Sequence, residues 1–135
     1  VDVYGPNANA TTFDVAHGIV LAIQNGATIV NLSLGSEGDS TLLRTVIQNG
    51  SKNGVVFVGA AGNEPVATPF YPAAYEQVIA VTAGDRRGNI ASYANHGDFV
   101  DVIAPGANVV QYNGSSYFVS GTSTSAAYVS GMVAG

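Results

Sequence analysis

The chain of 135 residues is long enough for one domain or part of one, and it contains no cysteine, which excludes disulfide and thiolate chemistry. Four basic against nine acidic residues give a net charge of −5, which argues against nucleic-acid binding because that function needs a basic surface. Only 10% of the residues are charged, well below the ~25% of a typical domain, so we expect much of the chain to be buried, as in a sheet covered on both faces.

The first half of the chain alternates between strand and helix patterns. Residues 1–4 alternate like a short strand, and residues 28–34 and 55–58 are rich in the β-branched residues of buried strands. A helix capped by Thr11 or Thr12 is predicted over about residues 13–24, and a second helix over about residues 40–53. Their predicted inward faces are Phe13, Ala16, Ile19, Val20 and Ile23 in the first helix, and Leu42, Leu43, Val46 and Ile47 in the second. This order predicts parallel strands and right-handed crossovers, hence an α/β fold with a doubly wound, mostly parallel sheet and helices on both faces.

Turn signals divide the second half of the chain. A strand is predicted over residues 78–82, a turn at residues 85–88, and a further apolar stretch over residues 99–103. Asn113-Gly114 lies between residues 109–112 and 116–119, which is a strong hairpin signal. The last helix follows Gly121, and we expect Thr122 or Ser123 to be its N-cap.

A serine at the start of this last helix has a chemical meaning. The first turn of a helix presents unpaired backbone N–H groups and the positive end of the helix dipole. These groups favour negative charge, including the oxyanion that forms when a serine attacks a carbonyl. Ser123 is therefore a candidate nucleophile, although a plain helix cap is the commoner role of a Gly-Thr-Ser taken alone.

The motif Gly121-Thr122-Ser123, followed by Val129 and Gly131, resembles the active-site serine segment of the subtilisin-like serine proteases. The usual pattern of that family is Gly-Thr-Ser-Met-Ala-x-Pro-His-Val-Ala-Gly. Five positions depart from it: Thr124, Ser125, Ala127, Tyr128 and Ser130 stand for the methionine, first alanine, proline, histidine and second alanine. Further motifs follow the family in order and spacing: Asn31 to Gly35, Ala60 to Asn63, Tyr71-Pro72-Ala73, Ser92 to Asn95 and Ala104-Pro105-Gly106. The resemblance covers essentially the whole chain, so residues 1–135 are expected to form a partial subtilisin-like peptidase domain.

The resemblance implies a role for each motif. Ser123 would be the nucleophile, and the Asn63 side-chain amide and the Ser123 N–H would bind the oxyanion. The peptide cleft would be formed by Ser33, Leu34 and Gly35, by Ala60, Ala61 and Gly62, and by Thr122. Extended peptides are commonly held in this way, by main-chain hydrogen bonds to a strand. Taken singly, a strand end at Ser33 and a turn at Asn63 are ordinary structural features.

The catalytic acid and the histidine of the family lie in segments upstream of the serine, and neither segment pattern occurs in this sequence. We expect His17 and His96 to be surface or packing residues, and Asp98 and Asp101 to belong to a structural loop. A hydroxyl without an adjacent base is a poor nucleophile. The hypothesis is therefore that the 135-residue chain alone is essentially inactive.

The expected partners follow from the same resemblance. A peptide or protein substrate is implied, and the exposed apolar face of a half-domain predicts contact with the N-terminal part of its own catalytic domain or self-association. Neither nucleic acid nor a membrane is expected, since the sequence has no apolar run of spanning length. No cofactor is required, but some relatives hold a metal ion at positions that match Ala73, Tyr75, Val78 and Asp101, where carbonyls and one carboxylate suit Ca²⁺ or Na⁺. The family is usually secreted.

Two other readings remain open from the sequence. Thr124, Ala127 and Tyr128 in place of the usual residues favour a non-catalytic homologue that acts as a peptide-binding or structural module. A nucleotide-binding α/β domain is weaker, because no Gly-x-Gly-x-x-Gly or P-loop pattern follows a strand.

Overall fold

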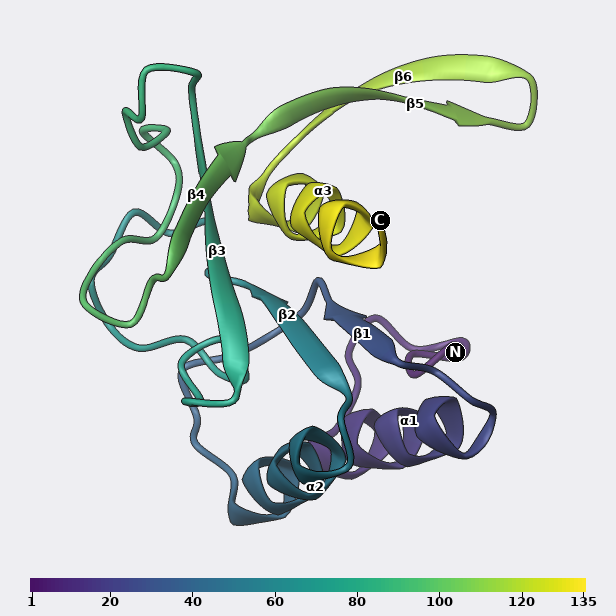
Figure 1. Cartoon of the computed structure of the whole chain (residues 1–135). Coiled ribbons are helices and arrows are strands. Elements are labelled where there is room, and N and C mark those ends of the chain that lie inside the picture. Colours follow the sequence, from purple (N-terminus) through teal and green to yellow (C-terminus); the bar gives the residue numbers. More distant parts are fainter.

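The computed structural model describes residues 1–135 and contains a four-stranded sheet with helices on both faces and a separate hairpin (Figure 1). The helices are α1 (Thr12–Gln24), α2 (Thr41–Lys52) and α3 (Thr122–Ala134). The sheet strands are β1 (Ile29–Leu32), β2 (Val56–Ala60), β3 (Val78–Gly84) and β4 (Val102–Pro105), and the hairpin strands are β5 (Ala107–Tyr112) and β6 (Ser115–Ser120). The sheet order is β1-β2-β3-β4 and every neighbouring pair is parallel, which confirms the predicted α/β class.

The two helices that precede β1 and β2 both begin at side-chain caps, and the first of these caps, Thr11, is one of the two residues that the sequence predicts. Thr11 accepts the N–H of Asp14 at 3.2 Å, and the Asp14 carboxylate accepts the Thr11 N–H at 2.9 Å, which together form a capping box. Ser40 caps α2 by accepting the Leu43 N–H at 3.3 Å. Both caps are local in sequence, so they form wherever the chain enters a helix at these residues.

The predicted inward faces of these helices are partly wrong. Phe13 is 67% exposed, Val20 36% and Leu42 47%, whereas the most buried residues of α1 are Val15, Ala16, Gly18 and Ile19. Phe13 and Val20 lie roughly 120–140° around the helix from the centre of that buried stripe. The packing of α1 against α2 and β1 selects the stripe, because helical spacing alone allows more than one apolar face.

Side chains alternate between the two faces along the strands, so the sheet has a separate hydrophobic core on each face. Val30 and Leu32 of β1 pack with α1 and α2 in the larger core, together with the fully buried Phe57. Val58 and Val81 pack on the other face against Ala126 and Val129 of α3. Because side chains alternate between faces, Asn31 and Ser33 lie on the α3 side of β1. The β1 edge of that face is therefore polar, although the rest of it is apolar.

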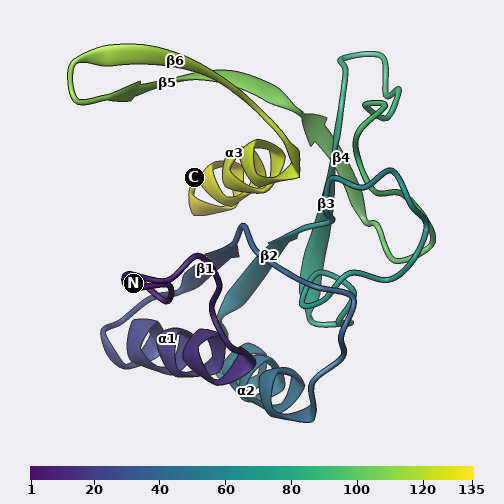
Figure 2. The ribbon, with the colours of Figure 1, turned by 180° about the vertical axis from the view of Figure 1, so that it is seen from behind.

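The N-terminal segment differs from the prediction, whereas the hairpin agrees with it. Residues 1–4 form no strand, because the Asp2 carboxylate accepts the N–H groups of Tyr4 and Gly5, each at 3.0 Å, and closes a turn. The predicted hairpin is confirmed, and Asn113 (φ 47°) and Gly114 (φ 77°) form the left-handed turn that this dipeptide favours. The hairpin extends away from the sheet beyond α3 (Figure 2), and β6 leads the chain directly to Gly121 and α3.

Candidate active site

Helix α3 begins at the carboxyl end of the sheet with an unusual cap. The prediction that Thr122 or Ser123 is the N-cap is wrong: the cap is Gly121, which has φ 144° and makes no side-chain hydrogen bond. An L side chain rarely adopts this conformation, so glycine is favoured there. The Thr122 side chain is buried and accepts the Gly62 N–H at 3.1 Å, a contact between distant segments that local sequence does not reveal.

Ser123 is consequently left free at the first turn of α3. Its side chain is exposed, and neither its hydroxyl nor its backbone N–H makes a hydrogen bond within the chain. The N–H groups of the next two residues bond to the Gly121 carbonyl at 3.2 and 3.4 Å, which closes the helix turn beneath it. A free hydroxyl therefore stands next to a free N–H at the positive end of the helix dipole.

Asn63 follows β2 after two small residues and is tied to the same helix start. Its Oδ1 accepts the Thr122 N–H at 2.9 Å. This bond fixes the orientation of the amide, because oxygen and nitrogen point in different directions from the same carbon. Its Nδ2 has no partner in the chain, so a hydrogen-bond donor remains available beside Ser123.

A buried asparagine supports the loop that carries Asn63. Asn95 is 1% exposed, donates its N–H to the Gly62 carbonyl at 2.9 Å, and accepts the Glu64 N–H through Oδ1 at 2.7 Å. The Thr82 hydroxyl donates to the Asn95 carbonyl. Gly62 has φ 105°, and a Cβ there would lie 2.5 Å from Asn95 Nδ2, so no side chain fits. The sequence motif contained Asn95, but its supporting role is visible only in the structure.

These segments line a hollow of about 280 Å³, called here the Ser123 hollow, whose lining residues are Ser33, Leu34, Ala60, Gly62, Asn63, Glu64, Phe70, Thr122 and Ser123. Its volume is just below the ~300–1,000 Å³ of pockets that enclose a whole small ligand, which suits a site that holds part of a longer ligand. Seven predicted site residues thus lie together. Glu64 and Phe70 were missed, and no sequence signal placed Phe70 here.

The two remaining predicted cleft residues lie behind or beside the hollow. Ala61 is fully buried and donates its N–H to the Val81 carbonyl at 2.9 Å, which continues the sheet. Gly35 is exposed, but a Cβ on it would lie 2.4 Å from Phe70 Cε1 and 2.6 Å from the Tyr71 carbonyl oxygen. The lack of a side chain at Gly35 lets the Phe70 ring lie against the backbone.

Comparison with known proteins identifies the family of the chain. The profile of the Subtilase family matches residues 1–135. The chain belongs to the subtilase family. A thermophilic serine proteinase of Bacillus sp. (strain AK1) is 42% identical over 130 residues, which are 95% of this chain and 32% of that protein. The minor extracellular protease Epr of Bacillus subtilis (strain 168) is 36% identical over 122 residues, 90% of this chain and 19% of that protein.

A solved structure gives the same result for the fold. The prenylagaramide maturation protease PagA superposes with a TM-score of 0.86 at 32% identity, over 93% of this chain and 49% of that chain. The subtilase chain thus spans about a third of the length of the Bacillus proteinase and about half of this structure. The first of these relatives is named a serine proteinase and the other two are named proteases, and the fold of PagA agrees with the parallel sheet described above.

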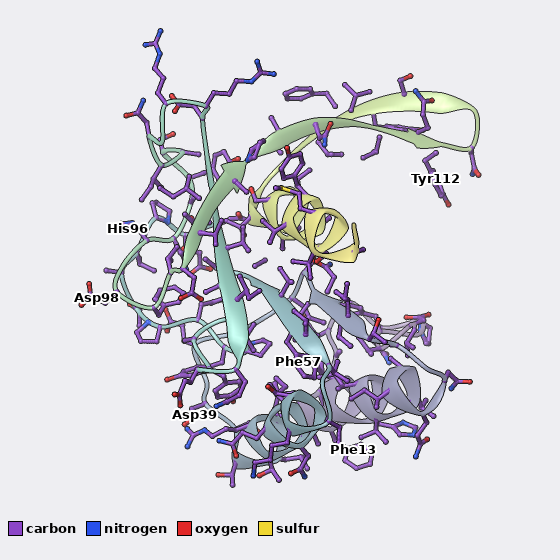
Figure 3. All side chains as sticks on the ribbon, viewed as in Figure 1. Phe13, Asp39, Phe57, His96, Asp98 and Tyr112 are labelled. Atoms are coloured by element: carbon purple, nitrogen blue, oxygen red, sulfur yellow. The ribbon has the colours of Figure 1, made fainter.

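No imidazole lines the Ser123 hollow of this subtilase chain. His17 lies on α1 beside Phe13, with ring centroids 6.1 Å apart, on the opposite face of the sheet from α3 (Figure 1). His96 and Asp98 lie on the loop between β3 and β4 (Figure 3), where the His96 N–H donates to the Val66 carbonyl at 3.0 Å. Neither histidine is hydrogen bonded to Ser123, so no general base for it is present among these residues.

The residues suggested for a cation are already partly engaged. The Tyr75 carbonyl accepts the Val78 N–H at 2.9 Å, and Oδ2 of Asp101 accepts the Ala80 N–H at 2.8 Å. The structure contains no cluster of three or more histidine, aspartate or glutamate side chains, so a cation there would depend on carbonyl oxygens. The cation site stays a prediction.

None of the three helices combines the length and the apolar character that crossing a bilayer requires.

Proposed function

We propose that this chain is the part of a subtilase endopeptidase that carries the nucleophile and the oxyanion hole. The observation that supports this most directly is the bond from the Thr122 N–H to Asn63 Oδ1, which leaves Asn63 Nδ2 and the Ser123 N–H as free donors on two residues that line the same hollow. Two converging donors next to an exposed hydroxyl are what acyl transfer from a peptide requires.

Unpaired backbone beyond β1 provides a way to hold the peptide. The N–H and C=O groups of Ser33, Leu34 and Gly35 make no backbone hydrogen bonds within the chain. They continue β1 toward the Ser123 hollow, so an extended substrate can add to them as a strand. This arrangement would align the scissile carbonyl with Ser123 without reading substrate side chains.

The reaction then follows from the groups in place. Ser123 Oγ attacks the scissile carbonyl carbon while a general base takes its proton, and the resulting oxyanion accepts from Asn63 Nδ2 and the Ser123 N–H. Collapse expels the amine, which takes up that proton, and water hydrolyses the acyl ester by the same steps. The base must come from outside residues 1–135, since no histidine lies at the hollow.

Activity is therefore proposed for the complete protease, and the 135-residue chain alone is expected to be essentially inactive. In the complete protease, Ser123→Ala should abolish hydrolysis of a fluorogenic peptide. Ser51→Ala is the matched control, because Ser51 lies in α2 on the other face of the sheet and its side chain makes no hydrogen bond. Turnover that survives Ser123→Ala refutes the proposal, and peptide binding without any turnover supports the non-catalytic homologue instead.

A protein partner is proposed for the open edge of the sheet. β1 has a neighbour only on its β2 side, and an apolar hollow beside it is lined by Val3, Ile19, Ile29 and Leu32 among others. The N-terminal part of the same catalytic domain would cover it, or a second copy would when that part is absent. Sedimentation of the purified 135-residue chain tests this proposal, and a stable monomer that melts cooperatively contradicts it.

We also propose an extracellular location, which the name of the Bacillus subtilis relative supports. Detection of the protease in culture medium rather than in the cells that produce it tests this.

A further inference from the structure

Four polar groups form a chain of hydrogen bonds from the middle of α3 to the carbonyl of the nucleophile. The Ser130 hydroxyl bonds to Oδ1 of Asn31 at 3.0 Å. Nδ2 of Asn31 donates to Oγ of Ser33 at 2.9 Å, and Oγ of Ser33 donates to the Ser123 carbonyl at 3.2 Å. Ser130 stands where the family pattern has an alanine, so this chain of bonds depends on a residue particular to this sequence.

The direction of each bond is determined by the number of hydrogens available. The Asn31 amide presents its oxygen to Ser130 and its nitrogen to Ser33. Because Ser33 receives a hydrogen from Asn31, its own single hydrogen is directed to the Ser123 carbonyl. If the Asn31 amide turned over, its oxygen would face Ser33 and accept that hydrogen, and the bond to Ser123 would be lost.

Ser130 controls which way the amide faces. Its single hydroxyl hydrogen has two acceptors, the Asn31 Oδ1 at 3.0 Å and the Ala126 carbonyl at 2.9 Å. Donation to Asn31 favours the orientation in which Nδ2 points at Ser33. Without the hydroxyl, nothing else in the chain bonds to Asn31 Oδ1, so the amide turns over more readily, although the orientation with Nδ2 on Ser33 still makes one hydrogen bond more.

The chain of bonds from Ser130 through Asn31 and Ser33 to the Ser123 carbonyl, called here the relay, also completes the attachment of α3 to the sheet. On the β4 side, the Ser125 hydroxyl bonds to the carbonyls of Ala104 and Pro105 at 3.2 and 3.0 Å. On the β1 side, the Ser33 bond is the one side-chain hydrogen bond that reaches the first turn of α3. The first turn is thus held from both edges of the sheet, and a small rotation of α3 about Ser125 would displace Ser123 from the hollow.

We infer that Ser130 and Asn31 are positioning residues for the nucleophile, which act through the Ser33 hydrogen on the Ser123 carbonyl. Only the expected effect on kcat rests on the proposed function, because the hydrogen bonds themselves do not depend on it. Loss of the relay should lower kcat and leave KM unchanged, because peptide binding uses the backbone of residues 33–35. One neutral hydrogen bond corresponds to about a fivefold change in rate.

A double-mutant cycle on Ser33 and Ser130 in the complete protease shows whether the two residues act through one another or independently. Ser33→Ala should lower kcat about fivefold and Ser130→Ala by a smaller factor, and the double variant should be no slower than Ser33→Ala alone. Ser130→Thr keeps the hydroxyl and should restore the rate, whereas Ser51→Ala should change nothing. Losses that multiply in the double variant would overturn the relay, since they show that Ser130 acts without Ser33.

A spectroscopic measurement tests the relay independently of activity. With ¹³C-labelled serine carbonyls, the Ser123 carbonyl chemical shift should move in Ser33→Ala and, by a smaller amount in the same direction, in Ser130→Ala, although Ser130 does not touch that carbonyl. Asn31→Asp should move it as well, because a carboxylate accepts the Ser33 hydrogen. An unchanged shift in Ser130→Ala overturns the relay even when the protease is active. Turnover that survives Ser123→Ala refutes the proposed function alone.

Discussion

The backbone N–H of Thr122 and the side-chain oxygen of Asn63 are 2.9 Å apart, although 59 positions separate the two residues in the chain. The bond joins the loop after β2 to the start of α3. A second bond runs the other way, from the Gly62 N–H to the Thr122 hydroxyl at 3.1 Å. The two bonds fix the nucleophile segment against the oxyanion segment.

Replacing Asn63 should reduce turnover and leave substrate binding intact. Asn63→Ala removes one of two oxyanion donors, and loss of such a donor in this family lowers kcat by about 10²–10³-fold. KM should be unchanged, because the donor bonds mainly to the charge that develops in the transition state. Steady-state kinetics of the complete protease measure both constants. Asn49→Ala on α2 is the control. If KM of the Asn63→Ala variant rose by as large a factor as its kcat was expected to fall, Asn63 would bind the substrate instead.

Thr122→Val should destabilise the fold by about 1–3 kcal/mol, because it leaves the buried Gly62 N–H without a partner. Thr122→Ser keeps the acceptor and should cost less, through the loss of one methyl group. Thermal unfolding of the complete protease gives the comparison. A Val variant as stable as the Ser variant would mean that the hydroxyl contributes shape and not a hydrogen bond.

Gly62→Ala should be more damaging than an alanine at an ordinary left-handed glycine. Both Gly62 (φ 105°) and Gly54 (φ 86°) have positive φ, but a Cβ at Gly54 meets nothing within 4 Å, whereas one at Gly62 lies 2.5 Å from Asn95 Nδ2. Backbone strain alone costs about 1–3 kcal/mol. Gly62→Ala should therefore lower the melting temperature more than Gly54→Ala, and the difference measures the cost of the clash with Asn95. Equal losses would indicate that Asn95 moves aside freely.

Phe70 should limit the size of the side chain that enters the Ser123 hollow. Its ring lies against Gly35, and a Cβ on Gly62 would come within 3.3 Å of Phe70 Cδ1, so the ring spans two walls of the hollow. Phe70→Ala enlarges the space, and the ratio of kcat/KM for peptides with a large against a small side chain should rise at least about tenfold. Phe13→Ala, on the far face of the sheet, is the control. An unchanged ratio would place the specificity elsewhere.

Asp14 should make folding stability depend on pH in the acid range. The hydrogen bonds from the Thr11 hydroxyl and N–H hold the pKa of Asp14 below its usual 3.8. The stabilisation is therefore complete above about pH 4 and is lost as the pH falls through the lower folded-state pKa. The melting temperature of the wild type should exceed that of Asp14→Asn above pH 4, and the two should converge in stronger acid. A difference that grows as the pH falls would contradict this assignment.

Local features of the fold could be predicted from the sequence because the groups that form them are neighbours in the chain. The Thr11–Asp14 capping box, the Ser40 cap and the Asn113-Gly114 turn each need only a few adjacent residues. The parallel sheet could be predicted as well, since strand and helix patterns alternate along the chain. The expected strand at residues 1–4 was wrong because a strand needs a neighbour to bond to, and Asp2 offers the backbone a local alternative.

Sequence motifs alone determined that Ser123 and Asn63 are candidates for one site, through their order and their small neighbours. Only the tertiary structure decided that Gly121 and not Thr122 caps α3, that Asn95 supports the Asn63 loop, and that Phe70 closes the hollow. Each of these facts depends on a contact between segments far apart in the chain. Spacing and propensity describe what a residue can do locally, whereas packing and long-range hydrogen bonds decide which of those possibilities is used.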